Sequence, residues 1–452
     1  MIQQGHQLAL ELFQHIAERL DRKLKTPIRT FFIPLIFGAL LAIARRRTVT
    51  KWIQAAGLSK KYQSIFYHMS NIGCNSKELF GEIIKCITEQ LGDVIATAFF
   101  IRLVLDDTPT KRYGPKVEGA GYHHNPTPGK TDAKLCYGHS WVVATLVMTH
   151  PLFGEVSFPI GAELYLRQKE IDKLKAKYGR QFKTKMTIAV EMIERLVPEF
   201  KGFEKRIHVI VDGGYANESV LSPLDKLTNV VVITRFRRDV ALFEIPLQSV
   251  VRGRGRPRKY GKQIDVKSLV ASLDGWEEIE CRQYGRWVTK RVKSFIATSR
   301  ITRGKPIKVV IVKEDEKTWL PLISTDVEVS ALDILESYAV RFGIEEMFKD
   351  LKEVWGWGKQ ELRLLESNEG AATMNMLLFG MTELATWDRS SAELVDRQYS
   401  PWDDESRRPS HSDRRNYLRR AVVARELKDA MQWAKIPAKI MHTLEKLMQI
   451  AA

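Results

Sequence analysis

The feature that most constrains this chain is a set of four polar residues spaced at helical intervals around position 345. Tyr338, Arg341, Glu345 and Lys352 lie at offsets of 0, 3, 7 and 14. A helix turns about 100° per residue, so these side chains fall within an arc of roughly 60° on one helix face. A carboxylate can hold a divalent cation, and neighbouring Arg and Lys side chains can bind phosphate. The pattern therefore predicts a helix suited to chemistry on a nucleic-acid backbone.

The spacing Y-(2)-R-(3)-E-(6)-K resembles the YREK signature of bacterial cut-and-paste insertion-sequence transposases, a branch of the DDE enzymes. All four positions match, and Phe342 replaces the Trp that usually follows the Arg of the motif. The same four residues are also compatible with a solvated amphipathic helix that carries intrahelical charge pairs. The resemblance covers residues from about 100 to 365 and implies an RNase H-like fold.

Composition limits the possible partners of the chain. Its 452 residues suffice for two or three domains, and 44% of them are hydrophobic, which indicates a globular protein. A net charge of +17 suits a polyanionic partner, either nucleic acid or an anionic membrane. The most apolar run, 31–44, is too short to span a bilayer. Without a signal peptide or paired cysteines, we expect a cytoplasmic protein associated with the bacterial nucleoid.

Two further acids follow apolar runs that are typical of strands. Ile101–Leu105 precedes Asp106, and Ile207–Val211 precedes Asp212. Strand ends in a mixed sheet can lie side by side, so acids distant in sequence can meet. Asp107 is adjacent to Asp106 and points to the opposite side of a strand, so the first acid remains open between them. We choose Asp106 because the resembled family often reads Asp-x-Thr at this place.

Three carboxylates at one point repel each other, and divalent cations resolve the conflict. We therefore predict Asp106, Asp212 and Glu345 as catalytic residues and ligands of two Mg²⁺ ions, with Mn²⁺ as a substitute. The resemblance implies hydrolysis that frees a 3′-OH, attack of this hydroxyl through a hairpin intermediate, and joining to target DNA.

The order of elements predicts an α/β, RNase H-like mixed sheet with flanking helices, a β-rich insertion, and helical terminal regions. We expect a helical DNA-binding region at 1–98, in which 48–68 has a helix-turn-helix layout that ordinary helical hairpins share. The first part of the catalytic core follows at 99–235, and the insertion at 236–326. The final helices of the core occupy 327–388, and a linker with a helical C-terminal region occupies 389–452.

Other residues are predicted to contact DNA. The resemblance implies that Tyr338, Arg341 and Lys352 hold phosphates, and Lys349 lies on the same helix face. It also implies that Trp319 stacks on a flipped base, although a core Trp in a strand is equally compatible. A basic loop resembles an AT-hook and can contact the minor groove or phosphates alone. Its candidate residues are Arg254, Arg256, Arg258 and Lys259.

The partners implied by the resemblance are double-stranded DNA, as transposon ends and target, and a second copy of the chain in a homodimeric synaptic complex. Two alternatives remain. One is an RNase H-like nuclease that cuts without strand transfer, and the other is a domesticated transposase that acts as a DNA-binding regulator. The intact acids Asp106, Asp212 and Glu345 favour an enzyme.

Overall fold

A computed structural model describes residues 2–42, 47–124, 133–246, 258–315, 318–395, 397 and 402–433. Its N-terminal part is helical, as predicted. The helices are α1 (Ile2–Asp21), α2 (Thr26–Leu41), α3 (Val49–Ala55), α4 (Tyr62–Cys74), α5 (Ser76–Gln90) and α6 (Gly92–Thr97). Helix α2 corresponds to most of the long apolar run, and its side chains Phe32, Leu35 and Ile36 are buried in the core.

Helices α3 and α4 have the layout predicted for residues 48–68. Thr48 caps α3 by accepting a hydrogen bond from the amide of Lys51. The chain then turns at Gly57, whose φ of 69° favours glycine, and enters α4 through a short 3₁₀ turn at Ser59–Lys61. The first residues of α4 are exposed, whereas its later turns are buried. A DNA-reading role for this pair stays a prediction.

The centre of the protein is an 11-stranded mixed sheet. Its strands are β1 (Ile101–Lys111), β2 (Gly121–His124), β3 (Leu135–His150), β4 (Gly154–Tyr165), β5 (Ile207–Val211), β6 (Val230–Arg235), β7 (Leu242–Phe243), β8 (Glu277–Gln283), β9 (Arg286–Ser299), β10 (Pro306–Lys313) and β11 (Trp319–Ser324). The order β4-β3-β1-β5-β6 combines two antiparallel pairs with two parallel pairs. This is the strand arrangement of the predicted RNase H-like sheet.

Strand β1 continues beyond the point where the sequence predicts its end. Its parallel pairing with β5 stops at Leu105 opposite Val211, but its antiparallel pairing with β3 continues to Lys111 opposite Gly138. Asp106 and Asp107 therefore lie within β1, and the prediction that the strand ends in the segment 106–109 is wrong. The reason is that hydrogen bonds from β3 alone keep the chain extended after β5 has ended.

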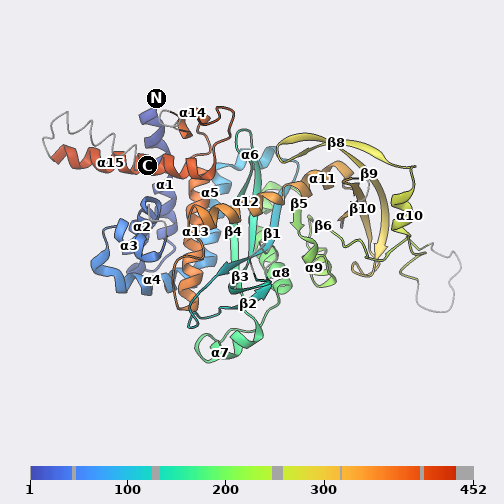
Figure 1. The fold of residues 1–452 in the computed structure, drawn as a ribbon, viewed down its shortest axis with the longest axis horizontal. Coiled ribbons are helices and arrows are strands. Elements are labelled where there is room, and N and C mark those ends of the chain that lie inside the picture. The colour runs from blue at the N-terminus through green and yellow to red at the C-terminus, as the bar shows by residue number, and fades with distance from the viewer. Residues whose placement is uncertain are drawn as a thin grey trace.

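The inserted strands continue the central sheet. Strand β11 pairs with β6 in antiparallel orientation, and β10 and β9 follow in turn. Figure 1 shows β8, β9 and β10 at one end of the molecule, with the N-terminal helices α1 to α4 at the other, beyond α13 (Leu365–Ala385).

Helices cover both faces of the sheet. Helix α8 (Lys185–Leu196) contacts β3 and β4, and α12 (Phe342–Glu353) contacts β1 and β4. The remaining helices are α7 (Gln168–Tyr178), α9 (Glu218–Leu224), α10 (Val266–Ala271), α11 (Ala331–Ala339), α14 (Ser391–Leu394) and α15 (His411–Trp433). Among the described helices, none combines the length and apolarity that crossing a bilayer requires.

The predicted continuous helix from Tyr338 to Lys352 is divided into α11 and α12. The break is a tight turn in which the amide of Arg341 donates to the carbonyl of Tyr338 at 3.2 Å, and that of Gly343 to Val340 at 3.0 Å. Gly343 permits a close approach to β4, because a Cβ atom there would lie 2.8 Å from the Ser157 hydroxyl. The four motif residues therefore come from two helices and, for Arg341, from the turn between them, and the single-helix prediction is wrong.

Candidate active site

Strand register brings the first two predicted acids to neighbouring positions. The last parallel pair of β1 and β5 is Leu105 with Val211. Asp106 and Asp212 are the residues that follow this pair in the two adjacent segments of the chain. Side chains alternate along a strand, and Asp106 points toward the face that α12 covers, where it reaches Arg341. The pairing of β1 with β5 thus brings together two acids that are far apart in sequence.

Arg341 connects the acids of the sheet with the acid of α12. Its Nη1 atom lies 3.0 Å from Oδ2 of Asp106, and its Nη2 atom lies 2.7 Å from Oε1 of Glu345. The guanidinium also packs over the Tyr338 ring, 5.8 Å from its centroid. The structure therefore gathers Asp106 and Glu345 around one cation, with Asp212 on the adjacent strand end.

The surroundings of Asp106 disfavour its charged form. Burial raises the pKa of Asp106 to about 7, although Arg341 acts in the opposite direction. The nearby negative charges of Asp107 and Asp212 add to the increase in pKa. An additional cation at this place would stabilise the carboxylate, because it would offset both the burial and the repulsion.

Asp107 lies in a different environment on the opposite face of β1. Its Oδ2 atom is 2.5 Å from Nζ of Lys185, the first residue of α8. Its Oδ1 atom accepts a hydrogen bond from the hydroxyl of Tyr215 at 3.1 Å. Tyr215 is buried and belongs to the short turn that follows Asp212. Asp107 is thus paired away from Arg341 and Glu345.

Lys352, Tyr338 and Lys349 have different environments near the acids. Lys352 is directed to β1, where its Nζ donates to Oγ1 of Thr108 at 2.6 Å. Burial lowers the pKa of Lys352 to about 8. Burial raises the pKa of Tyr338, whose hydroxyl is therefore neutral at physiological pH. Lys349 lies exposed on α12.

Two arginines near the acids were missed by the sequence analysis. Arg235 ends β6 beside β5, and its Nη2 atom is 3.7 Å from Oδ1 of Asp212. Arg238 follows, and its guanidinium lies 5.5 Å from the centre of the Trp319 ring. The signal was available in principle, because the carboxyl ends of parallel strands share one edge of a sheet.

Trp319 begins β11 and is half-buried, opposite Lys313 of β10. It therefore lies on the sheet at the end of the insertion, as the sequence predicts, while base stacking stays a prediction. In the basic loop, Arg254 and Arg256 lie outside the described residues. Arg258 and Lys259 are described and exposed.

The donor set is compatible with a hard divalent cation. Asp106, Asp212 and Glu345 offer carboxylate oxygens, the ligand type that Mg²⁺ prefers. Within the described parts of the chain, no three His, Cys, Asp or Glu residues already form a metal-sized cluster. The Arg341 guanidinium lies between Asp106 and Glu345 instead. Binding of a metal by the three acids therefore requires Arg341 to shift away from at least one of them.

The fold and this edge of the sheet define an RNase H-like protein with carboxylates directly after the last parallel pair of its central strands β1 and β5. A family model of the DDE superfamily endonucleases matches residues 19–294, which is more than half of the chain. The chain therefore belongs to the DDE superfamily endonucleases. Enzymes of this superfamily use divalent metal ions. The matched range contains Asp106 and Asp212 and ends before Glu345.

Among solved structures, the chain shows similarity to the piggyBac transposase synaptic complex with hairpin DNA, determined by cryo-electron microscopy. The sequence identity is 9% and the TM-score is 0.37, with 97% of this chain and 75% of the other covered. No curated protein matches the chain.

Proposed function

We propose that this protein is a DNA transposase that cleaves DNA at the ends of its element by metal-dependent phosphodiester hydrolysis and joins the freed 3′-OH to target DNA. The observation that carries the proposal is the meeting of Asp106 and Glu345 on Arg341, beside Asp212. Membership of the DDE superfamily endonucleases supports the reaction class. The complete YREK spacing supports the step from endonuclease to transposase.

Each residue at the site has a proposed role. Asp106, Asp212 and Glu345 hold two divalent cations, which supply activation of the attacking oxygen and stabilisation of the leaving oxygen. Asp106 is preferred over Asp107 because Asp107 is paired with Lys185 on the other face of β1. Arg341 leaves the carboxylates when cations are present and grips a phosphate, for which its planar guanidinium is well suited.

Four other cationic or aromatic groups complete the proposed DNA contacts at this edge. Lys352 reaches the site from the end of α12, and exposed Lys349 follows the same helix. The Tyr338 hydroxyl donates a hydrogen bond to phosphate, and Trp319 stacks on an unpaired base. Arg258 and Lys259, together with Arg254 and Arg256, contact the DNA outside the site. A homodimer pairs the two element ends so that cutting and joining are coordinated.

The test uses two variants on one helix. Glu345→Gln removes the proposed ligand, and Glu346→Gln removes an equal charge from the next residue. Because the electrostatic contribution of a metal is several kcal/mol, Glu345→Gln should slow cleavage of end-containing DNA by about 10²–10³-fold. DNA binding in EDTA should remain, and Glu346→Gln should cleave normally. Unchanged cleavage by Glu345→Gln would refute the assignment of Glu345.

Strand transfer separates the proposal from the nuclease alternative. Incubation with pre-cleaved element ends and a supercoiled plasmid should yield joined products that depend on a free 3′-OH. Products of cutting without any joined DNA would favour an RNase H-like nuclease. Binding of the ends without metal-dependent cutting would favour a DNA-binding regulator.

A further inference from the structure

One face of the inserted strands carries a row of cations and indole rings, of which the proposed catalytic site uses Trp319 alone. Across the sheet, Arg291 of β9 faces Lys313 of β10, and Lys313 faces Trp319 of β11. Directly paired residues project from the same face of a sheet, so these three side chains form a row. Neighbouring strands are about 4.8 Å apart, so the row spans about 10 Å.

Aromatic contacts extend this row at both ends. Arg238 packs over the Trp319 ring at 5.5 Å. At the other end, the ring of Trp276 has Arg291 at 5.9 Å and Lys313 at 6.0 Å from its centroid. We call the five residues Arg238, Trp276, Arg291, Lys313 and Trp319 the insertion stripe. It alternates cationic and aromatic side chains, as surfaces that bind single-stranded nucleic acid do.

The accessible charge of the stripe lies on its arginines. Arg238 and Arg291 are exposed, and neither forms an ion pair within the described part of the chain. Lys293 also lies near the Trp276 ring, but it is buried and donates to the carbonyls of Leu269 and Ser272 at the end of α10. Lys293 therefore has a structural role and is not part of the stripe.

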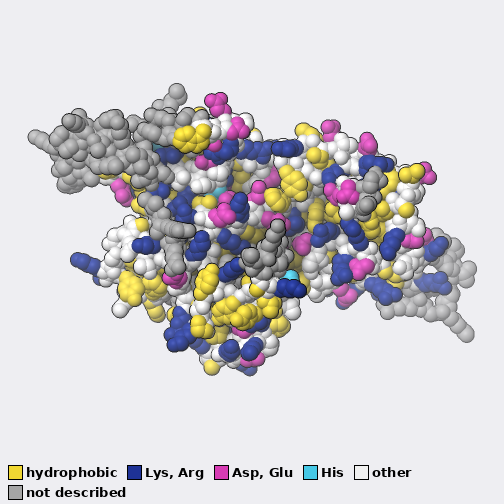
Figure 2. All heavy atoms as spheres, in the orientation of Figure 1, with side chains coloured by type: hydrophobic (Ala, Val, Ile, Leu, Met, Phe, Trp, Pro, Cys, Tyr) yellow, Lys and Arg dark blue, Asp and Glu magenta, His cyan; other side chains and the backbone are white. Residues whose placement is uncertain are grey.

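An acidic group borders the stripe at β8. Glu278 of β8 faces Arg291, so the positive stretch ends at that strand. From β8 the stripe extends across the sheet toward β6, to Arg238. Arg238 comes shortly after Arg235, the residue that contacts Asp212. Figure 2 shows Lys and Arg side chains, with Asp and Glu among them, over the end of the molecule that carries β9, β10 and α10. The exposed arginines of the stripe complement a polyanion.

We propose that the insertion stripe binds the backbone of an unpaired DNA strand. Single-stranded DNA fits because its phosphates can meet Arg238, Arg291 and Lys313 while its bases contact indole rings. At 3.4 Å per nucleotide of stacked strand, the row of about 10 Å accommodates about three nucleotides. The choice of DNA rests on the proposed function, whereas the surface itself does not depend on the acids.

The experiment measures binding of a fluorescein-labelled 15-nucleotide single strand to the full chain in EDTA, where metal-dependent cleavage cannot occur. The test variant is Arg238→Gln/Arg291→Gln. The control is Arg286→Gln/Lys308→Gln, which removes the same charge from positions of β9 and β10 that alternate to the opposite face. Thermal unfolding confirms that both variants are folded.

The test variant should bind the single strand about tenfold more weakly, and the slope of log K against log salt should fall by about 1.4, because each lost phosphate contact on a single strand contributes about 0.7. The control should bind as the wild type does. Equal losses in both variants, or no loss in either, would overturn the inference. Tighter binding of an RNA strand of the same sequence would overturn the choice of DNA.

This outcome is separable from that of the proposed function. If the wild type cleaves DNA and the test variant binds the single strand unchanged, the proposed role of the insertion stripe is refuted, and the transposase proposal still stands. Selective loss of binding in a chain that never cleaves would support the stripe and contradict the enzyme.

Discussion

At the residue scale, Arg341 explains how three acids can be placed together in a folded chain. Unpaired carboxylates at one point would repel each other, and Arg341 contacts two of them at 3.0 and 2.7 Å. The guanidinium can later serve phosphate, because both ligand types accept the same planar pair of donors. The site therefore has one cation that stabilises the acids in the absence of DNA and is available to bind a phosphate of the substrate.

Lys352 makes the proposed phosphate contact sensitive to alkaline pH. Its pKa is lowered by burial to about 8, from an ordinary value of 10.5. If Lys352 binds phosphate, kcat/KM for DNA cleavage should fall as pH rises through about 8, since this parameter reports groups of the free enzyme. Lys352→Arg should remove the alkaline loss, because an arginine keeps its charge throughout this range.

The alkaline loss predicted for Lys352 is distinguishable from unfolding. Between about pH 8 and 10.5 the unfolded chain binds more protons at this residue than the folded chain, so the contribution of Lys352 to stability rises with pH. Chemical denaturation over the same pH range checks this sign. An alkaline limb that persists unchanged in Lys352→Arg would show that another group is responsible.

Tyr215 is predicted to position the turn that carries Asp212. Its hydroxyl donates to Asp107 at 3.1 Å, which joins the turn after β5 to β1, and the amide of Asp107 donates to Asp106. Tyr215→Phe should raise the Mg²⁺ concentration needed for half-maximal cleavage. Tyr178→Phe is the matched control, because that hydroxyl donates to the carboxylate of Glu118 at 2.6 Å, on another part of the protein.

Both tyrosine variants lose a hydrogen bond to a carboxylate, so each should lower the free energy of unfolding by about 1.5–3 kcal/mol. Only Tyr215→Phe should change the metal dependence. An equal change in both variants would mean that lost stability, and not the position of Asp212, sets the requirement for metal.

The neighbouring positions of Asp106 and Asp212 could be predicted from sequence, but the partners of the acids could not. An apolar run before Asp106 and another before Asp212 indicated strand ends, and the motif indicated Glu345. The ion pair of Asp107 with Lys185 depends on a helix that begins 78 residues later, and no local pattern encodes that contact. The same holds for Arg235, whose place beside Asp212 follows from strand order.

At the element scale, helix α4 packs closely against α13, and the amino-acid composition does not reveal this contact. A Cβ atom at Gly370 of α13 would lie 1.9 Å from the carbonyl oxygen of Met69, and one at Gly73 of α4 would lie 2.0 Å from that of Glu366. Two glycines therefore allow the helix backbones to touch. Glycine in a helix usually lowers stability, and here the packing provides the reason for it.

Gly370→Ala should therefore destabilise the protein by about 1–3 kcal/mol or more, because the added methyl group meets backbone that cannot move aside alone. Gly81→Ala in α5 is the control, since a Cβ atom there has no neighbour within 4 Å. That substitution should stabilise the protein by about 0.5–1 kcal/mol. Urea unfolding of both variants measures the two effects, and destabilisation of equal size at both sites would contradict the packing argument.

Element boundaries were predictable where local pattern decides them. Strand β5 occupies the predicted range Ile207–Val211 because all five side chains are buried and four of them are apolar, with His208 as the exception. The break between α11 and α12 was not predictable from periodicity, which continues across it. It depends on the approach of Gly343 to β4, a contact between segments that are far apart in sequence.

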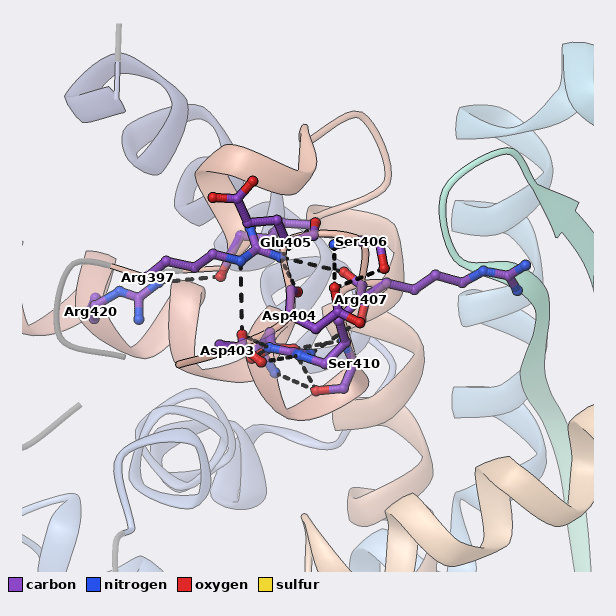
Figure 3. A network of polar contacts seen from close by, with 11 residues as sticks. Arg397, Asp403, Asp404, Glu405, Ser406, Arg407, Ser410 and Arg420 are labelled. Atoms are coloured by element: carbon purple, nitrogen blue, oxygen red, sulfur yellow. Dashed lines mark hydrogen bonds and ion pairs between the residues drawn. The ribbon is translucent and has the colours of Figure 1, made fainter. Parts of the chain in front are cut away.

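At the scale of the whole molecule, the C-terminal segment shows how a polar stretch can be ordered by ion pairs. An Arg- and Ser-rich stretch at 389–415 predicts a linker. In its described part, Arg407 binds Asp403 at 2.8 Å and Asp413 at 2.7 Å, and Ser410 caps α15 through Asp413. Figure 3 shows Asp403, Arg407 and Ser410 close together in one network of polar contacts. Polar composition here builds a hydrogen-bonded unit that precedes α15.

The continuous sheet leads to a prediction about cooperativity. The sequence predicts a β-rich insertion at 236–326, and in the structure β11 of this segment pairs directly with β6, and β10 pairs with β11. Helix α11 also contacts β5, β6, β8 and β11. Because core and insertion share hydrogen bonds and one covering helix, we expect them to open together. Hydrogen exchange with mass spectrometry should give amides of β5 and β10 the same opening free energy.

Strand β8 serves as the internal reference in that measurement, because among the described strands it pairs only with β9 and should exchange faster by local fraying. Added urea should bring the β5 and β10 amides to a single exchange transition, as expected for one cooperative unit. If β10 instead opens at a distinctly lower free energy than β5, the insertion folds as its own domain. In that case the insertion stripe and the acids could move relative to one another, and a strand bound to the stripe would no longer be held in a fixed position beside Asp212.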